Sequence, residues 1–158
     1  MKLRTQARNN WEYDLTHQET MCLRMVINAF PLTLDPAKTA VPISRTDSST
    51  QADERQRLLN DSLSEHRSQL KRRAAVFLTA DKLKEERNGW RLQLGAEERE
   101  FLLQLLNEIR IESWRALGEP ADLELVPRPD SHKELRLYNL MQLAGFFEFA
   151  LLDHEVGE

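Results

Sequence analysis

The chain has 158 residues, of which 41% are hydrophobic and 30% are charged, a composition that suits one domain over residues 1–158. Its formal net charge of −4 disfavours nucleic-acid binding, because proteins that bind phosphate backbones usually carry a positive excess. The single cysteine excludes an intrachain disulfide. The N-terminus does not resemble a signal peptide and no apolar run reaches membrane-spanning length, so we expect a cytoplasmic protein without a membrane partner.

The first predicted elements are a strand and a helix. Residues 11–15 alternate apolar and acidic side chains, which is the pattern of a half-buried strand. Thr16 and Glu19 then have the spacing of a capping box that begins a helix, and Pro31 ends that helix. Residues 31–51 contain prolines and serines without apolar periodicity, which predicts a long flexible linker.

Three further helices and a second strand are predicted downstream. Asn88-Gly89 is a turn signal that precedes a strand over residues 90–94 and a helix over 96–117. The last helix begins near residue 131 and reaches about 153. Between the linker and the turn, a helix over 52–78 carries an apolar stripe formed by Leu59, Leu63, His66, Leu70, Ala74 and Phe77, with the histidine as a core or boundary residue.

The chain contains an internal similarity between residues 8–30 and residues 87–109. Arg8-Asn9-Asn10-Trp11 resembles Arg87-Asn88-Gly89-Trp90, and a strand followed by a helix comes after each. A duplication of a strand-helix unit is one explanation, and chance is the other. Because two short strands are unstable alone, we expect them to pair antiparallel with Trp11 and Trp90 on the same face. The predicted fold is α+β, mostly α, with a four-helix core and a small antiparallel β element.

No convergent catalytic or metal-binding pattern is present, so we expect no catalytic residue, no metal and no cofactor. Asn28 and Asn107 are unusual because each interrupts an apolar helix, and Arg110 shares a helix face with Asn107. The favoured interpretation is that the two amides connect the repeated units. The alternative is a binding site for a small polar ligand.

Two surfaces are candidates for binding macromolecules. Basic residues cluster on the long helix, where they form either a solvated face, which we favour, or a nucleic-acid site: Arg67, Lys71, Arg72 and Arg73. The last helix is apolar in nearly every direction, so it either threads the centre of the bundle or pairs with a second copy to form a homodimer. In the homodimer, the contributing residues are expected to be Phe146, Phe147 and Phe149.

The segment Leu106-Asn107-Glu108-Ile109-Arg110, followed by Leu117-Gly118, resembles the L-N-D-L-R…L-G signature of the DUF2017 family. The resemblance implies an N-terminal strand and helix, a central Glu/Arg-rich helix, a short strand before the signature helix and an apolar last helix. The family has no established activity, although some members carry a transcription-regulator label and their genes often lie near those for a Clp-protease adaptor. The resemblance therefore implies a regulatory or interaction role and assigns no catalytic residue.

Three functions follow as hypotheses. The favoured one is a non-enzymatic protein-interaction or regulatory module with a protein partner. The second is a nucleic-acid-binding transcriptional regulator that uses the basic cluster. The third is a small polar-ligand binder around Asn107 and Arg110.

Overall fold

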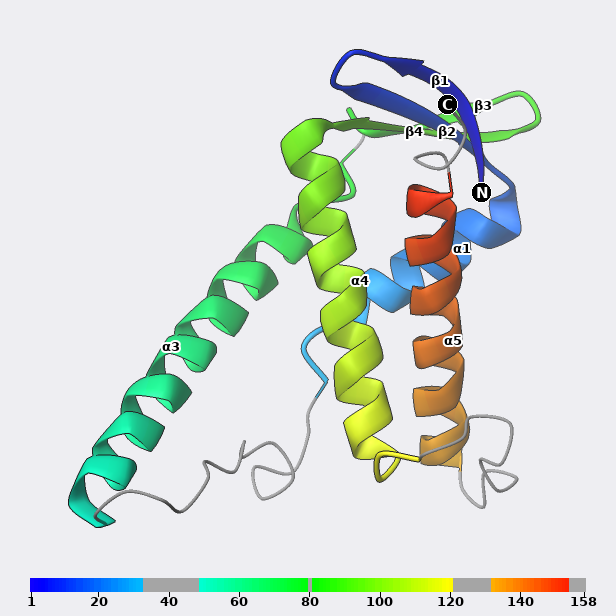
Figure 1. Ribbon diagram of the computed structural model, residues 1–158. Helices are drawn as coiled ribbons and strands as arrows, with labels where there is room; N and C mark the ends of the chain where they lie inside the picture. Colours follow the sequence, from blue (N-terminus) through cyan, green and yellow to red (C-terminus); the bar gives the residue numbers. More distant parts are fainter. Residues whose placement is uncertain (33–48, 80, 121–131, 154–158) are drawn as a thin grey trace.

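The computed structural model describes residues 1–32, 49–79, 81–120 and 132–153. Within those residues, a four-stranded antiparallel sheet lies across one end of a layer of helices (Figure 1). The predicted α+β fold, dominated by four helices, is confirmed for this part of the chain. Most of the predicted linker, the proline-containing loop before the last helix and the expected cap at Ser131 lie outside the described residues.

The sheet is built from two hairpins. β1 (Lys2–Ala7) pairs with β2 (Asn10–Leu15), and β3 (Leu83–Glu86) pairs with β4 (Gly89–Gly95). The strand order is β1-β2-β4-β3, so the two predicted strands form the centre and two unpredicted strands form the edges. The prediction of only two strands was wrong because β1 and β3 lack the alternating pattern of a half-buried strand.

The central strands β2 and β4 are related by a local two-fold axis. The axis carries the pair Trp11 and Leu94 onto the pair Trp90 and Leu15, which are equivalent positions of the two repeats, and it passes through the middle pair, Tyr13 and Leu92. Because alternate residues share a face, Trp11 and Trp90 lie on the same side of the sheet, and the predicted antiparallel pairing is confirmed. An evolutionary duplication stays a hypothesis. The pairs on the inner face are Trp11 with Leu94, Tyr13 with Leu92 and Leu15 with Trp90.

The helices pack against the inner face of the sheet. α4 (Ala96–Ala116) continues directly from β4, and α5 (His132–Leu152) runs antiparallel beside it, while α1 (His17–Asn28) crosses behind both (Figure 1). The predicted capping box begins α1, because the Glu19 N–H donates to Thr16 Oγ1 (3.1 Å) and the Thr16 N–H donates to Glu19 Oε2 (2.8 Å).

A single hydrophobic core joins the sheet to the helices. Tyr13, Leu92 and Leu94 point from the sheet into this core, which stabilises the fold by removing apolar surface from water. The helices contribute the remaining buried side chains, among them Leu23, Val26, Ile27, Phe101, Leu102, Leu105, Leu106, Ile109, Leu140, Ala144, Phe147 and Leu151.

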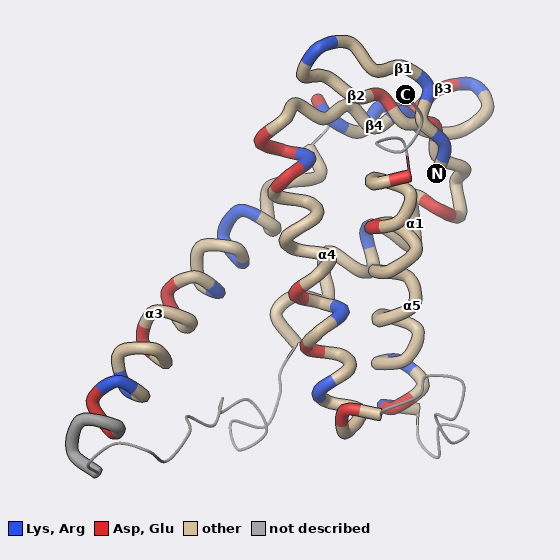
Figure 2. Tube along the Cα trace, in the orientation of Figure 1, with Lys and Arg blue, Asp and Glu red and all other residues tan. Residues whose placement is uncertain are grey.

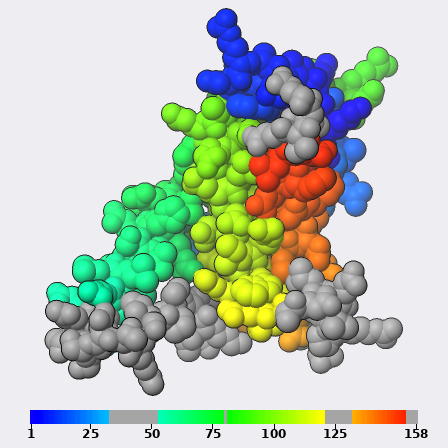
Figure 3. All heavy atoms as spheres, viewed as in Figure 1, coloured from blue at the N-terminus to red at the C-terminus, as the bar shows by residue number. Residues whose placement is uncertain are grey.

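α3 (Ser49–Ala75) leans away from the body toward its N-terminus (Figures 1 and 3). The C-terminal end of its predicted stripe is buried, as expected for Leu70. Ala74 and Phe77 are buried as predicted, whereas the N-terminal part of the stripe was predicted wrongly, since Leu59, Leu63 and His66 are exposed. Periodicity identifies one face of a helix, but α3 meets the core only near its C-terminal end.

Candidate functional site

One face of α5 is apolar or neutral and exposed to solvent. Exposed residues recur there at alternating steps of three and four, and we call these five the α5 stripe: Leu135, Asn139, Gln142, Phe146 and Phe149. Phe149 is 66% exposed and Phe146 is 46% exposed. Figure 2 shows long uncharged stretches along this helix, and Figure 3 shows its side chains open to solvent beside α4.

The opposite side of α5 is buried against the core. Leu140, Ala144 and Leu151 lie on this side, together with Phe147, which is only 1% exposed. The prediction that Phe147 belongs to an interaction surface was therefore wrong. The ring of Phe147 instead supports that of Phe146 in an edge-to-face contact with centroids 5.2 Å apart. The other two predicted residues, Phe146 and Phe149, remain available for binding.

A small apolar hollow lies beside the N-terminal end of the stripe, between α5 and α1. Met25 projects from α1, and Met21 is exposed one turn before it. The hollow measures about 220 Å³, below the usual size of a small-molecule pocket but large enough to take a side chain from another polypeptide. Its lining residues are Met25, His132, Leu135, Arg136, Asn139 and Leu140.

The predicted polar site is only partly assembled. Arg110 Nη2 donates to Asn107 Oδ1 (3.1 Å), and Arg110 Nε lies 3.4 Å from Glu148 Oε2, so these residues connect α4 to α5. Asn28 is exposed at the end of α1, and no hydrogen bond between described residues joins it to Asn107, so the predicted connection between the amides was wrong. Neither Asn107 nor Arg110 lines the hollow beside Met25 or the two polar hollows at the ends of β2 and β4.

The basic cluster on α3 does not form one free face. Arg67 pairs with a carboxylate of α4, and Arg73 donates to the Glu97 carbonyl (3.2 Å) while its guanidinium stacks over the ring of Phe101. Lys71 and Arg72 are exposed. Half of the predicted cluster is thus used to hold α3 against α4, because those two positions face the body of the protein.

The carboxylate that pairs with Arg67 belongs to Glu112, which is 2% exposed. Glu112 Oε2 accepts from the Leu32 N–H (3.2 Å), and Oε1 lies 3.3 Å from Arg67 Nε. Burial raises the pKa of Glu112 above its ordinary value, although the Leu32 N–H and Arg67 oppose the rise. This buried carboxylate joins three segments: α3, α4 and the chain after α1. Sequence reasoning missed it, although its position one turn after Ile109 on the buried face of α4 was an available signal.

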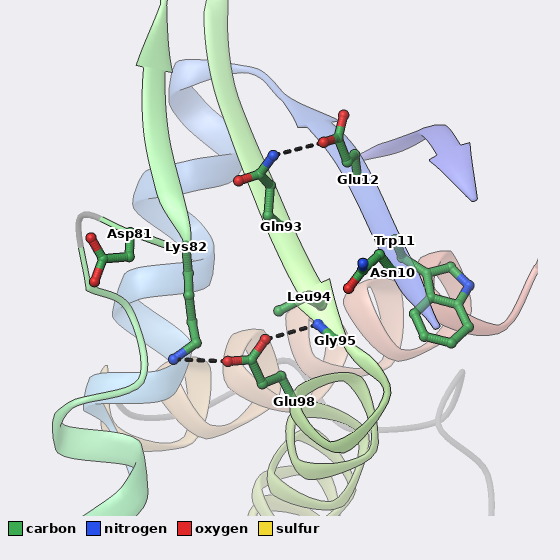
Figure 4. Close-up of a pocket in the computed structure, with 9 residues that line it drawn as sticks. All are labelled: Asn10, Trp11, Glu12, Asp81, Lys82, Gln93, Leu94, Gly95 and Glu98. Carbon is green, nitrogen blue, oxygen red and sulfur yellow. Dashed lines mark hydrogen bonds and ion pairs between the residues drawn. The ribbon is translucent and has the colours of Figure 1, made fainter. Parts of the chain in front are cut away.

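A polar hollow of about 480 Å³ lies at the end of the sheet where β4 meets α4 (Figure 4). Gln93 Nε2 donates to Glu12 Oε1 (2.6 Å), and Glu98 accepts from the Gly95 N–H (2.8 Å) and pairs with Lys82 (3.0 Å). Burial alone would raise the pKa of Glu98, but these two partners hold it below its ordinary value. The hollow is lined by Asn10, Trp11, Glu12, Asp81, Lys82, Gln93, Leu94, Gly95 and Glu98.

The local two-fold axis relates this hollow to a second one at the other end of β2 and β4. There Asp14 and Leu15 take the places of Gln93 and Leu94, and Arg4 pairs with Asp14 (3.4 Å). Arg4 also pairs with Glu86 across the outer face of the sheet (3.1 Å). In both hollows, most polar groups satisfy one another and fasten neighbouring strands, so their chemistry is explained by the fold.

No family profile, no curated protein and no solved structure matches this chain. The resemblance to the DUF2017 family therefore stays a prediction. Within the described ranges, no group of three or more His, Cys, Asp or Glu side chains is placed to hold a metal ion. No helix in the same part of the chain combines the length and apolar character needed to cross a membrane.

Proposed function

We propose that this protein is a non-enzymatic interaction module with a regulatory role, and that it binds another polypeptide through the α5 stripe and the adjoining hollow. The observation that carries the proposal is the exposure of Phe146 and Phe149 on a face without charge. Large solvent-exposed aromatic side chains lose their contact with water on binding and often dominate the binding energy of protein interfaces.

The form of the surface specifies the kind of partner. A helical stripe at steps of three and four matches the apolar face of another helix, and the hollow beside Met25 accepts one large side chain from it. The two alternative functions have less support. Arg67 and Arg73 are engaged with α4, and Arg110 is held by Asn107 and Glu148.

The test is photo-crosslinking in cells of the native host, with a benzophenone amino acid placed at position 149. We expect a discrete polypeptide adduct from this position, and loss of the adduct when Phe146 is also changed to Glu. The matched control carries the same probe at Lys84, which is exposed on a strand at the edge of the sheet. If position 149 gives no adduct, or gives the same products as position 84, the proposal is wrong.

A further inference from the structure

We infer that the α5 stripe pairs antiparallel with the α5 stripe of a second copy of this chain, so that the partner is the protein itself. The inference rests on the proposed function, because it names the partner of the same face. Its first support is the order of residues along the stripe. In an antiparallel pair centred between Asn139 and Gln142, four of the five stripe residues meet one of matching polarity: Asn139 faces Gln142 of the copy, and Leu135 faces Phe146.

The hollow gives the second support. His132 and Leu135 line it on α5, and Met25 lines it on α1. In the same antiparallel register, Phe149 of the copy lies opposite His132, and Phe146 of the copy lies opposite Leu135. The two exposed rings of each copy therefore meet the hollow of the other, which gives two equivalent aromatic anchors related by the two-fold axis.

Charge is the third support. The five residues of the stripe carry no charge, so the two stripes meet without like-charge repulsion, although each chain has a net charge of −4 and the exposed Arg136 lines the hollow beside the stripe. The nearest charged side chain toward α4 is Glu148, which is already paired with Arg110. Asn139 and Gln142 of the copy each carry an amide donor and an amide acceptor, so they hydrogen-bond to each other across the pair.

The available area also suits a dimer. An aromatic side chain has roughly 200 Å² to bury, so Phe146 and Phe149, at 46% and 66% exposure, offer roughly 220 Å² per copy. A stable interface needs about 800 Å² per partner. The two rings thus supply about a quarter of that area, and the other exposed apolar residues around the hollow and along α5 extend it: Met21, Met25, Leu135 and Leu152.

Sedimentation and light scattering at micromolar concentration test the pairing. We expect the wild type at twice the single-chain mass of 18.5 kDa, and Phe149→Glu at the single-chain mass. Leu58→Glu on α3 is the matched control, because Leu58 is 65% exposed against 66% for Phe149, and it should remain dimeric. Circular dichroism checks that each variant is folded, and Phe146→Glu replaces Phe149→Glu if the latter is not.

The outcomes separate this inference from the proposed function. A monomeric wild type overturns the inference, and a crosslink from position 149 to a different polypeptide would still support the proposed function. A dimer that survives both glutamate substitutions overturns the role of the stripe. An absence of any crosslink from position 149 contradicts both.

Disulfide formation tests the register, in chains whose Cys22 is replaced by serine. Mixing Asn139→Cys chains with Gln142→Cys chains should give a linked pair, whereas each variant alone should link poorly, because the two positions face each other only across an antiparallel pair. Rapid linkage of Asn139→Cys alone would show a parallel pair and overturn the antiparallel arrangement.

Discussion

At the scale of single residues, Gly89 has a strict backbone requirement. Its φ of +153° is unfavourable for any residue with a side chain, and a Cβ atom there would lie 2.5 Å from the carbonyl oxygen of Leu15. The glycine thus permits both the turn after β3 and the close approach of β4 to the end of β2. A turn signal in the sequence revealed the first role, but only the structure reveals the second.

Replacing Gly89 with alanine should destabilise the protein by about 2–3 kcal/mol, since both the dihedral angle and the contact with Leu15 must change. Urea unfolding measures the effect. Gly145→Ala is the matched control: its Cβ would lie 3.9 Å from Arg110 Cδ, an ordinary contact, so the helix should gain about 0.5–1 kcal/mol. A loss of similar size for both variants would contradict this account.

Glu112 should make stability depend on pH. The pKa of Glu112 is raised in the folded protein, so the unfolded chain releases this proton at lower pH than the folded one. The contribution of Glu112 to the free energy of unfolding is largest below the pKa of glutamate in the unfolded chain, near 4.3. It falls as pH rises through the pKa that Glu112 has in the folded protein. Glu108 adds to the rise in pKa, whereas Arg67 and Arg115 reduce it.

Glu112→Gln should therefore gain stability relative to the wild type between pH 4 and pH 7, since glutamine does not ionise. Urea unfolding of both proteins at several pH values gives the difference, and the contributions of the other titrating groups largely cancel in it. If the wild type instead gains stability relative to Glu112→Gln as pH rises, the ion pair with Arg67 outweighs the cost of burying the charge.

At the scale of elements, the sequence was sufficient for the parts that pack on the core. The alternation of apolar and acidic side chains over residues 11–15 predicted β2, and the capping box of Thr16 and Glu19 predicted the start of α1. Local pattern was sufficient there because each element buries one regular face. It was insufficient for β1, whose residues are mostly exposed and are held by pairing with β2.

The candidate site was predictable only in part. An apolar sequence on every side of α5 indicated that this helix carries excess apolar surface, but it did not indicate which side the core would cover. That side depends on how α4 and α1 pack against α5, so the burial of Phe147 and the exposure of Phe149 followed only from tertiary structure. The hollow beside Met25 joins two helices far apart in sequence, and no local pattern reveals it.

α3 should open locally before the rest of the fold. The N-terminal half of α3 has exposed apolar residues, and the ion pair of Arg67 with Glu112 holds the C-terminal half against α4. The N-terminal half of α3, taken as an isolated helix, has only marginal stability in water. Amide hydrogen exchange over residues 53–63 should therefore be much faster than over residues 101–109 of α4, whose buried face belongs to the core. Equal protection of the two segments would mean that the N-terminal half of α3 is covered in solution.

At the scale of the whole molecule, the net charge of −4 and the division of the basic cluster together disfavour DNA binding. We expect no gel shift of duplex DNA at physiological salt, because few phosphates are neutralised and salt weakens such contacts steeply. A shift that persists at this salt, and that Arg72→Glu combined with Arg73→Glu abolishes, would instead assign a nucleic-acid role to α3.

Dimerisation through the α5 stripe should also link thermal stability to protein concentration. Unfolding of a dimer releases two chains, so each tenfold rise in concentration favours the folded dimer by about 1.4 kcal/mol. Dividing this free energy by the unfolding entropy of two chains of 158 residues gives a rise in Tm of roughly 2 °C. Calorimetry from about 1 μM to about 100 μM protein should thus show a rise in Tm of about 4 °C for the wild type and for Leu58→Glu. Phe149→Glu should melt at a Tm independent of concentration, because its folded state is a single chain. A wild-type Tm that stays constant across this range would mean that the folded protein does not pair, and that the α5 stripe has another occupant.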